Sequence, residues 1–319
     1  MGRFIVRRLV GMVAVLFAIS VIVFVIFNVL PSGDPARRIA GRQQTPEQIR
    51  QINKDFGFDK PLVVQYAKTM QQIFTGTLIS YSDRTNVLTR IKQGLPATFS
   101  LAIGAAVIWM GFALVFGYLS AVKAGKFTDR ALTILSLIGI SMPVFLIGAV
   151  LLLYLTFKTH IFPGGGYVGL TDDPWQWFTH LVLPWTTLAI LFIGFYSRVL
   201  RSNMLDVMNE DYVRTARAKG LSERQVRIRH VFRNSLIPVI TLFGLDFGAV
   251  VGGGAILTET VFNLPGVGLY AGESVASLDL PPLIAVTMFG AFFIVLLNTI
   301  VDILYAYLDP RIRLGTEAA

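Results

Sequence analysis

Few residues in this 319-residue chain belong to the types that carry out catalysis or bind metals. Cysteine is absent, and the three histidines are His160, His180 and His230. Disulfides and thiolate metal sites are therefore excluded. His160 and His180 lie at the two ends of one predicted loop, where they either bind a metal as a pair or form ordinary hydrogen bonds at a membrane surface. We favour the second alternative and expect no metal site and no catalytic site.

The chain also lacks the residues that would bind a nucleotide. Gly125 and Lys126 are followed by Phe127, where a phosphate-binding loop has Ser or Thr for magnesium, and the upstream glycine is missing. We therefore expect this chain to bind no cofactor. If the protein takes part in an ATP-driven process, the energy must enter from another subunit.

The composition predicts a membrane protein. Hydrophobic residues make up 54% of the chain and charged residues 15%, whereas soluble domains carry about 25% charge. A membrane-spanning helix needs about 20 consecutive apolar residues. Six such runs cover residues 9–30, 97–122, 131–157, 181–200, 235–258 and 282–308. The first run exceeds the roughly 7–15 apolar residues of a secretion signal, so we expect an uncleaved anchor.

The distribution of basic residues predicts the orientation in the membrane. If the N-terminus is cytoplasmic, the inside segments 1–8, 123–130, 198–234 and 309–319 hold 17 Lys and Arg residues. The short outside loops 158–180 and 259–281 then hold 1. Cytoplasmic loops normally carry such an excess, so we expect both termini in the cytoplasm. The net charge of +9 thus needs no nucleic-acid partner, and no base-reading motif accompanies it.

The charged segment between the fourth and fifth predicted spans has the pattern of a helix. Tyr212, Val213 and Ala216 recur at helical spacing. Glu210 precedes Arg214 by four residues, which is the favourable order for an ion pair along a helix. We therefore expect a short amphipathic helix with a Glu210–Arg214 ion pair.

A glycine corner and a second helix are predicted to follow. Gly220 can adopt the left-handed backbone that ends a helix, and Ser222 with Gln225 forms a capping box for the next one. Taken by itself, this hairpin fits two alternatives equally well. It is either a docking element for another protein or an ordinary basic loop.

Several polar and small residues fall inside the fifth predicted span. Asp246 lies near its middle, where a carboxylate costs about 2.5–3.5 kcal/mol unless it faces protein or water. It either faces a transport pathway or partner helix, or forms a structural hydrogen bond inside the bundle. Gly244, Gly248 and Gly252 repeat every four residues, which lets helices approach closely in lipid. We expect tight packing there, with sliding between two states as the alternative.

Other features shape the remaining spans and the outside segment. Pro143 should kink the third span, whereas Pro238 is expected near the first turn of the fifth, where proline is harmless. Asp302 lies near the cytoplasmic end of the sixth span, where we expect a structural role. The outside segment 31–96 is too long for a simple connection, and short helices are predicted over 46–57, 60–74 and 87–93.

Several motifs together resemble one family of membrane proteins. Residues 212–222, Y-V-R-T-A-R-A-K-G-L-S, and 230–238, H-V-F-R-N-S-L-I-P, are similar to the coupling loop of ABC-importer permeases. The B-type subunits of dipeptide, oligopeptide and nickel importers are the most similar group. R-R-L at 7–9, L-P-S-G-D-P at 30–35, E-T-V-F-N-L-P-G-V-G at 259–268 and D-P-R-I-R at 309–313 extend the resemblance over the whole chain. The general E-A-A signature is matched only in part, since Arg214, Thr215 and Ala216 occupy its positions.

The resemblance implies an all-α polytopic membrane protein with six transmembrane helices and the architecture of a type I ABC-importer permease. It implies an N-terminal part, 1–96, with the first span and the outside helical segment. A core permease domain, 97–308, would contain the coupling loop 201–234, and 309–319 would form a cytoplasmic tail. The implied location is the inner (plasma) membrane of a prokaryote.

The resemblance also implies partners and a cargo. The partners would be a second, homologous permease subunit, two cytoplasmic ATP-binding subunits that bind ATP and Mg, an extracytoplasmic substrate-binding protein, and membrane lipid. The cargo would be dipeptides or oligopeptides, with nickel chelates or another small solute as alternatives. A stand-alone secondary transporter, the alternative from another class, would need ion-coupling carboxylates and an inverted repeat, and we find neither in the sequence.

Residue roles follow from the same resemblance. The residues expected to couple the chain to the ATPase subunits are Glu210, Asp211, Tyr212, Val213, Arg214, Thr215, Ala216, Arg217, Ala218, Lys219, Gly220 and Leu221. The residues expected near the pathway or its gate are Asp246, Gly248, Gly252, Glu259, Pro265 and Gly266.

Overall fold

The structure is a computed structural model that describes residues 2–29 and 45–308. In this part of the chain the only β-type pairing is an isolated bridge between Ile79 and Asn86. The expected all-α class is confirmed. The motifs at 30–35 and 309–313, the tail 309–319 and the side chain of Asp302 lie outside the described residues.

The helices follow one another along the chain in three groups. The N-terminal group consists of α1 (Gly2–Phe24), η1 (Val25–Val29), α3 (Pro46–Phe56) and α4 (Leu62–Thr75). The middle group consists of α5 (Val87–Val122), α6 (Phe127–Ser141), α7 (Val144–Leu151), η2 (Leu152–Lys158) and α8 (Pro174–Met208). The last group consists of α9 (Asp211–Ala218), α10 (Glu223–Gln225), η3 (Val226–Phe232), α11 (Arg233–Ala249), η4 (Val250–Gly254), α12 (Ile256–Val261), α13 (Val267–Ala276) and α14 (Leu280–Leu308).

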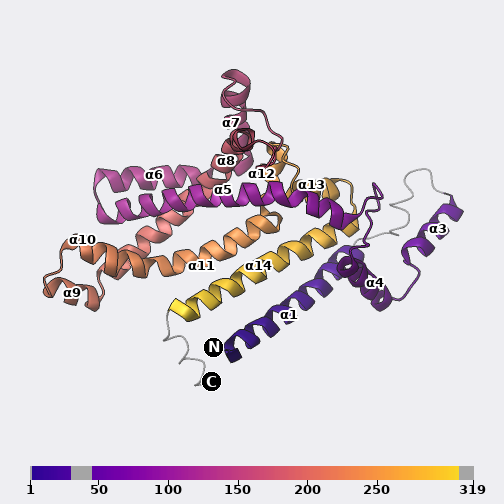
Figure 1. Cartoon of the computed structure of the whole chain (residues 1–319), viewed down its shortest axis with the longest axis horizontal. Helices are drawn as coiled ribbons and strands as arrows, with labels where there is room; N and C mark the ends of the chain where they lie inside the picture. The colour runs from indigo at the N-terminus through magenta and orange to yellow at the C-terminus, as the bar shows by residue number, and fades with distance from the viewer. Residues whose placement is uncertain (1, 30–44, 309–319) are drawn as a thin grey trace.

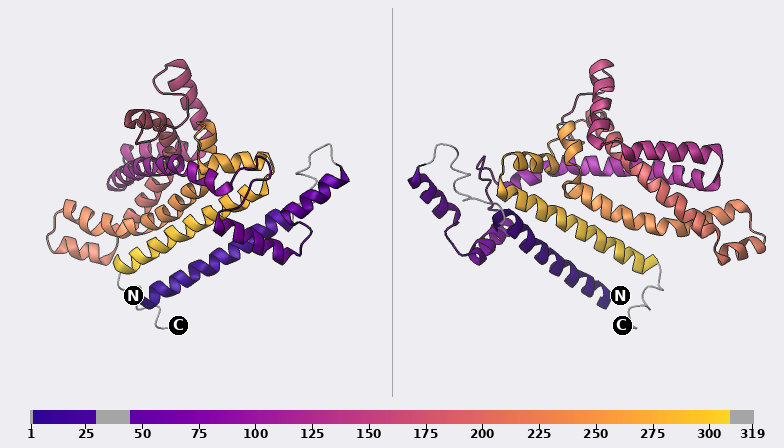
Figure 2. Two further views of the ribbon diagram at one scale, coloured as in Figure 1. Left: turned by 45° about the vertical axis from the view of Figure 1, so that its right-hand side comes forward. Right: turned by 180° about the vertical axis from the view of Figure 1, so that it is seen from behind.

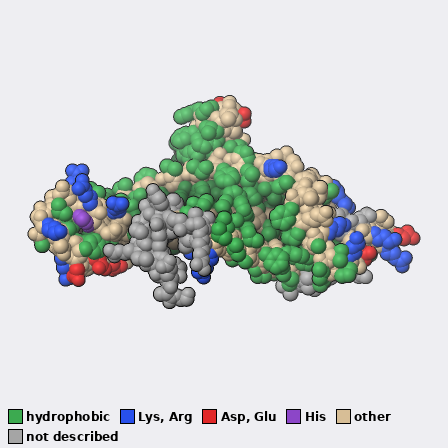
Figure 3. Space-filling view, turned by 60° about the horizontal axis from the view of Figure 1, so that its bottom comes forward, with side chains coloured by type: hydrophobic (Ala, Val, Ile, Leu, Met, Phe, Trp, Pro, Cys, Tyr) green, Lys and Arg blue, Asp and Glu red, His purple; other side chains and the backbone are tan. Residues whose placement is uncertain are grey.

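Among the described residues, five continuous helical segments are long and apolar enough to cross a membrane, namely Val6–Asn28, Val87–Val122, Pro174–Met208, Glu223–Gly254 and Leu280–Val301. They run roughly along the long axis of the molecule (Figure 1). Helices α9 and α10 lie at one end of this bundle, whereas α3, α4 and α13 lie toward the other (Figures 1 and 2). Apolar side chains cover the middle of the molecule and charged ones gather at its two ends (Figure 3), as expected for a bundle solvated by lipid.

The third predicted span is sharply bent. Helix α6 and the helix formed by α7 and η2 meet at 98°, so the described part of the chain has six spans only if this pair is counted as one span. Pro143 lies at the corner with an extended backbone, because proline lacks an N–H donor and cannot continue a helix from the preceding turn. The kink predicted at this residue is confirmed, and α7 projects from the bundle (Figure 2).

Two helix boundaries differ from those expected. The helix predicted over 87–93 is not separate, because α5 starts at the Asn86 cap, whose side chain accepts a hydrogen bond from Thr89 N, and continues through Pro96. Pro238 is not in a first turn, because the π-helical segment η3 joins α10 to α11 without a break. Pro96 and Pro238 both lie inside a helix, where each lacks the N–H that would donate a helical hydrogen bond.

Small residues allow the spans to pack closely. A Cβ atom at Gly104 of α5 would lie 2.1 Å from Trp185 of α8, and one at Gly117 would lie 2.8 Å from Leu200. The predicted glycine stripe faces α14, since a Cβ at Gly252 would lie 2.7 Å from Gly290 Cα. In this conformation the glycine stripe therefore allows tight packing against α14, as we expected from the spacing.

Replacing Gly252 by alanine should destabilise the bundle. The new methyl group would meet the backbone of α14, which cannot rotate away, and such overpacking costs about 1–3 kcal/mol. The thermal unfolding temperature of the purified protein in detergent should therefore fall. Gly111→Ala is the matched control, because nothing lies within 4 Å of the Cβ position there. Equal unfolding temperatures for the two variants would contradict the packing described.

Candidate functional site

The predicted hairpin between α8 and α11 is present. Helix α9 begins at Asp211, directly after Glu210, and Gly220 ends it with a left-handed φ of 80°. Ser222 and Gln225 then form both halves of the capping box that starts α10. The geometry of helix, glycine corner and second helix is therefore confirmed, and it lies at the end of the bundle where basic side chains gather (Figure 3).

The inner face of this hairpin is attached to the rest of the chain. Val213 and Ala216 of α9 are buried, as is Val226 of η3. The side chain of Asn234, in the first turn of α11, donates a hydrogen bond of 2.9 Å to Tyr212 Oη. Val213 and Ala216 were expected to contact a partner protein, but they pack inside this chain. An eight-residue helix is unstable by itself, so its apolar stripe is needed for its own attachment.

The outer face of the hairpin is free. The exposed fractions of Tyr212 and Leu221 are 42% and 38%. Asp211 and Arg214 form an exposed ion pair of 3.4 Å, so the predicted pairing of Arg214 with Glu210 is wrong. Glu210 has an extended backbone and precedes the helix, which moves its side chain out of the helical register.

One ion pair braces the corner between the two helices. Arg217 Nε of α9 lies 2.9 Å from Glu223 Oε1 of α10, across the glycine turn. The remaining members of the predicted coupling set, Thr215, Ala218 and Lys219, lie along the same helix and its end. The arrangement offers a small, rigid and largely polar surface with two exposed apolar side chains.

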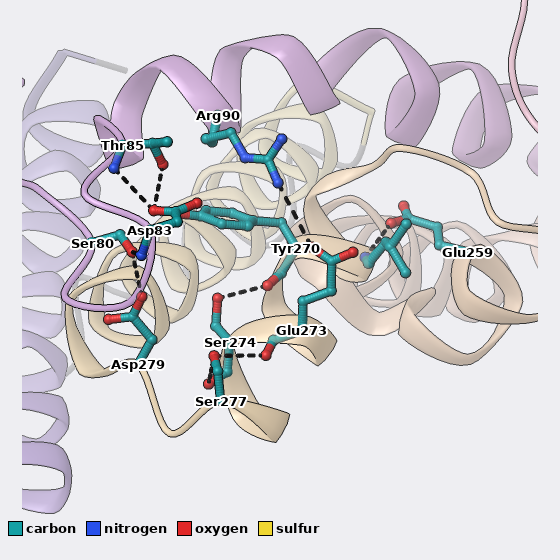
Figure 4. A network of polar contacts seen from close by, with 11 residues as sticks. Ser80, Asp83, Thr85, Arg90, Glu259, Tyr270, Glu273, Ser274, Ser277 and Asp279 are labelled. Carbon is teal, nitrogen blue, oxygen red and sulfur yellow. Dashed lines mark hydrogen bonds and ion pairs between the residues drawn. The ribbon is translucent and has the colours of Figure 1, made fainter. Parts of the chain in front are cut away.

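A buried carboxylate organises the opposite end of the bundle. Glu259 of α12 is fully buried and accepts hydrogen bonds from Thr98 Oγ1 of α5 at 2.7 Å and from Leu269 N of α13 at 2.8 Å. Thr98 Oγ1 also accepts a hydrogen bond of 2.9 Å from Val267 N. A Cβ atom at Gly266 would lie 2.3 Å from the Glu259 carboxylate. One carboxylate and one hydroxyl thus join α5, α12 and the first turn of α13 (Figure 4).

The chemistry of Glu259 is that of a structural acceptor. Burial raises the pKa of this carboxyl, whereas hydrogen bonds from Thr98, Leu269 N and Gly268 N oppose the rise. All these partners are donors, so the site is built for carboxylate oxygens. Pro265, which was predicted near the gate with Glu259 and Gly266, lies exposed at the turn before α13.

A second carboxylate at this end was not predicted. Asp279 precedes α14 and is buried, and it accepts hydrogen bonds from Ser80 Oγ, Tyr81 N and Ser82 N. It therefore holds the loop before α5 against the start of the last span (Figure 4). A lone acidic residue just before an apolar run is a weak signal, and nothing in the sequence identifies partners about 200 residues away.

Aromatic and charged groups extend this network to the surface. Arg90 lies over the Tyr270 ring, 5.3 Å from its centre, and 3.7 Å from Glu273. Burial, together with the charges of Asp83 and Asp279, raises the pKa of Tyr270 to about 12. Arg90 of α5 therefore contacts α13 mainly through the Tyr270 ring, whereas its ion pair with Glu273 is exposed.

The residues predicted inside the fifth span lie apart from Glu259. Tyr196 Oη of α8 donates a hydrogen bond of 2.6 Å to Asp246 Oδ2, so the carboxylate has a partner inside the bundle and remains partly exposed. Gly248 and Gly252 face α14. A pathway role for these three residues stays a prediction.

The histidines lie in separate settings. His180 Nδ1 forms a hydrogen bond of 2.8 Å with the carbonyl oxygen of Gln176, one turn earlier in α8. Within residues 2–29 and 45–308, no group of three His, Cys, Asp or Glu side chains is placed to hold a metal ion.

Comparison with known proteins decides the family. Residues 113–314 match the binding-protein-dependent transport system inner membrane component, and residues 1–102 match the N-terminal part of such membrane components. The chain belongs to this family. The permease is 37% identical to a probable peptide ABC transporter permease of Sinorhizobium fredii, over 98% of this chain and 100% of the relative.

Two relatives from Escherichia coli are similar over nearly their full length. A probable D,D-dipeptide transport system permease is 36% identical over 97% of each chain. A glutathione transport system permease is 36% identical over 98% of this permease and 99% of the relative. The protein is therefore a multi-pass inner-membrane permease component of a binding-protein-dependent importer.

Replacing Glu259 by glutamine should loosen the contacts that hold residues 264–270. The amide keeps the volume but replaces one acceptor oxygen by a donor, which leaves a buried group unpaired at a cost of about 1–3 kcal/mol. Amide hydrogen exchange over residues 264–270 should become faster. Glu273→Gln is the control, because that side chain is 58% exposed. Unchanged exchange in the Glu259 variant would contradict its organising role.

Proposed function

We propose that this permease forms half of a translocation pathway for short peptides and receives its driving motion through α9 from cytoplasmic ATP-binding subunits. The observation that supports the proposal is the two-sided construction of the hairpin. Its inner face is buried, Tyr212 Oη accepts a hydrogen bond from Asn234 at the start of α11, and its outer face exposes Tyr212 and Leu221. A helix with one attached face and one exposed face can bind a partner and transmit the partner's movement to the spans.

The mechanism follows from helix continuity. Helix α8 ends at Met208, and α9 begins three residues later at Asp211. On the other side, α10, η3 and α11 lead without a break into the fifth span. A rotation of α9 would therefore move both spans as rigid bodies, which is a common form of switching transition. ATP and Mg would bind to the partner subunits, since this chain has no phosphate-binding loop.

The names of the relatives favour a peptide cargo. The curated relatives are described as transporting peptides, D,D-dipeptides and glutathione. We infer that this permease also carries short peptides, in preference to nickel chelates or another small solute. A substrate-binding protein outside the membrane would deliver them.

The proposed assembly contains a second permease, two ATP-binding subunits and the binding protein. The basic hairpin end would face the cytoplasm together with both termini, as the distribution of Lys and Arg favours. The end that carries α3, α4 and α13 would then face outward. There the ordered segment held by Glu259 is a suitable surface next to an outer gate.

Replacing Gly220 by valine should uncouple uptake from ATP hydrolysis without preventing membrane insertion. Open space surrounds the Cβ position and φ is +80°, so the cost is backbone strain of about 1–2 kcal/mol, which corresponds to roughly tenfold in an equilibrium. The measurement is ATP-driven peptide uptake in proteoliposomes. Gly220→Asn is the matched control, because asparagine tolerates this backbone. Full uptake by the valine variant would contradict the role of the corner.

Replacing Leu221 by aspartate should remove the ATP-binding subunit from the purified permease. Leu221 is exposed, so the substitution leaves the fold intact and places a charge on the contact surface. The measurement is co-purification of the ATPase with the tagged permease from membranes. Phe127→Asp, at the exposed start of α6, is the control and should retain the ATPase. If the wild-type chain retains no ATPase, the proposed function itself is wrong.

A further inference from the structure

We propose that Arg201 and Asp129 form a latch that makes the α5–α6 hairpin move together with α8 when α9 is displaced. Both would be positioning residues for transport, since neither belongs to the contact surface of α9. The inference rests on the proposed function, because it takes α9 as the point where motion enters. It adds an explanation of how a displacement of α9 is transmitted to the other helices of the bundle.

The latch is a bidentate ion pair. Arg201 Nε lies 2.7 Å from Asp129 Oδ1, and Arg201 Nη2 lies 2.8 Å from Asp129 Oδ2. The Asp129 side chain is only 5% exposed. Two parallel hydrogen bonds between planar groups fix orientation as well as distance, so α6 can neither turn nor slide against α8 at this point.

The same carboxylate holds two further parts of the chain. Ser120 Oγ, in the last turn of α5, donates a hydrogen bond to Asp129 Oδ1. Gly125 N, in the turn between α5 and α6, donates one of 2.8 Å to Asp129 Oδ2. Asp129 therefore joins the end of α5, the following turn, the first turn of α6 and α8. Each of its two oxygens accepts more than one hydrogen bond.

The position of Arg201 places the latch on the direct route from the hairpin. Arg201 lies ten residues before Asp211, the first residue of α9, and α8 is unbroken up to Met208. The helical stretch from Arg201 to Met208 extends about 10 Å, and Asn209 and Glu210 form a short turn before α9. A displacement of α9 thus reaches the latch through this turn and the last two turns of α8.

A close seam between α6 and α8 continues from the latch into the bundle. Ser136 Oγ and Ser197 Oγ form a hydrogen bond of 3.0 Å. A Cβ atom at Gly194 would lie 2.6 Å from the carbonyl oxygen of Ser136, and one at Gly139 would lie 3.1 Å from that of Ile190. The two backbones therefore touch, and the ion pair adds a charged contact at the end of this tightly packed interface.

The seam leads on to the outer end. Helix α6 ends at the Pro143 corner, and α7 beyond it packs against α8 and α12. Helix α12 carries Glu259, which holds α13 and α5. Packed elements thus connect α9 to the outer segment without a gap. Within this series of contacts, the Arg201–Asp129 ion pair lies nearest to α9.

Arg201→Lys and Asp129→Asn test the latch in the complete importer. Lysine keeps the charge of Arg201 but cannot form the two parallel bonds, and asparagine keeps the shape of Asp129 but not its charge. Peptide uptake and ATP hydrolysis are measured on the same proteoliposomes, per assembled complex. We expect both variants to hydrolyse ATP but to move at least tenfold less peptide per ATP. The matched control is Arg198→Lys, an exposed arginine one turn earlier on α8, which should keep the wild-type ratio.

A second experiment exchanges the charges of positions 129 and 201. In Asp129→Arg combined with Arg201→Asp, an ion pair can form again, and the amount of peptide moved per ATP should recover at least threefold over either charge-reversed single variant. A wild-type ratio in Arg201→Lys and Asp129→Asn overturns the latch. A parallel loss of uptake and hydrolysis also overturns it, because that result marks a structural role alone. In either case the ATPase subunits remain bound, which separates this failure from failure of the proposed function.

Discussion

Helix α9 has only eight residues, about two helical turns, and it cannot hold its shape without support from the rest of the chain. That support comes from the burial of Val213 and Ala216 and from the hydrogen bond between Asn234 and Tyr212. The same contacts determine which side chains remain for another protein. In the proposed mechanism, a helix attached in this way transmits its displacement to the spans beside it.

The polar interactions of the bundle are concentrated toward its two ends. Asp129 and Arg201 join three helices near the hairpin, and Glu259 joins three at the opposite end. Between them the helices pack mainly through glycine and apolar side chains, with interhelical hydrogen bonds at Tyr196–Asp246 and Ser136–Ser197. In lipid, where apolar surface gains little by association, close packing and hydrogen bonds hold helices together. In the proposed mechanism, the helices that these carboxylates join move together.

Features that depend on neighbouring residues could be predicted from the sequence. The left-handed Gly220, the capping box of Ser222 and Gln225, and the bend at Pro143 each follow from local backbone chemistry. The number and approximate position of the spans follow from apolar runs, although one of them is bent too sharply to be a simple span.

Features that depend on distant residues could not be predicted. Thr98, which donates to Glu259, and the partners of Asp279 lie more than 100 residues away in the chain, and the burial of Val213 depends on packing that no local pattern shows. The sequence spacing suggested a Glu210–Arg214 pair because it assumed a helix beginning one residue too early. The structure of the site therefore depends on long-range contacts and on the exact residue at which α9 begins.

The most direct test of this account is the accessibility of position 221 in a transporting complex. The chain has no cysteine, so Leu221→Cys introduces a single thiol that a water-soluble maleimide can label. Labelling should be rapid in the isolated permease and at least tenfold slower in the assembled importer. Equally rapid labelling in an importer that still moves peptide would show that α9 touches no partner, and the account would be wrong.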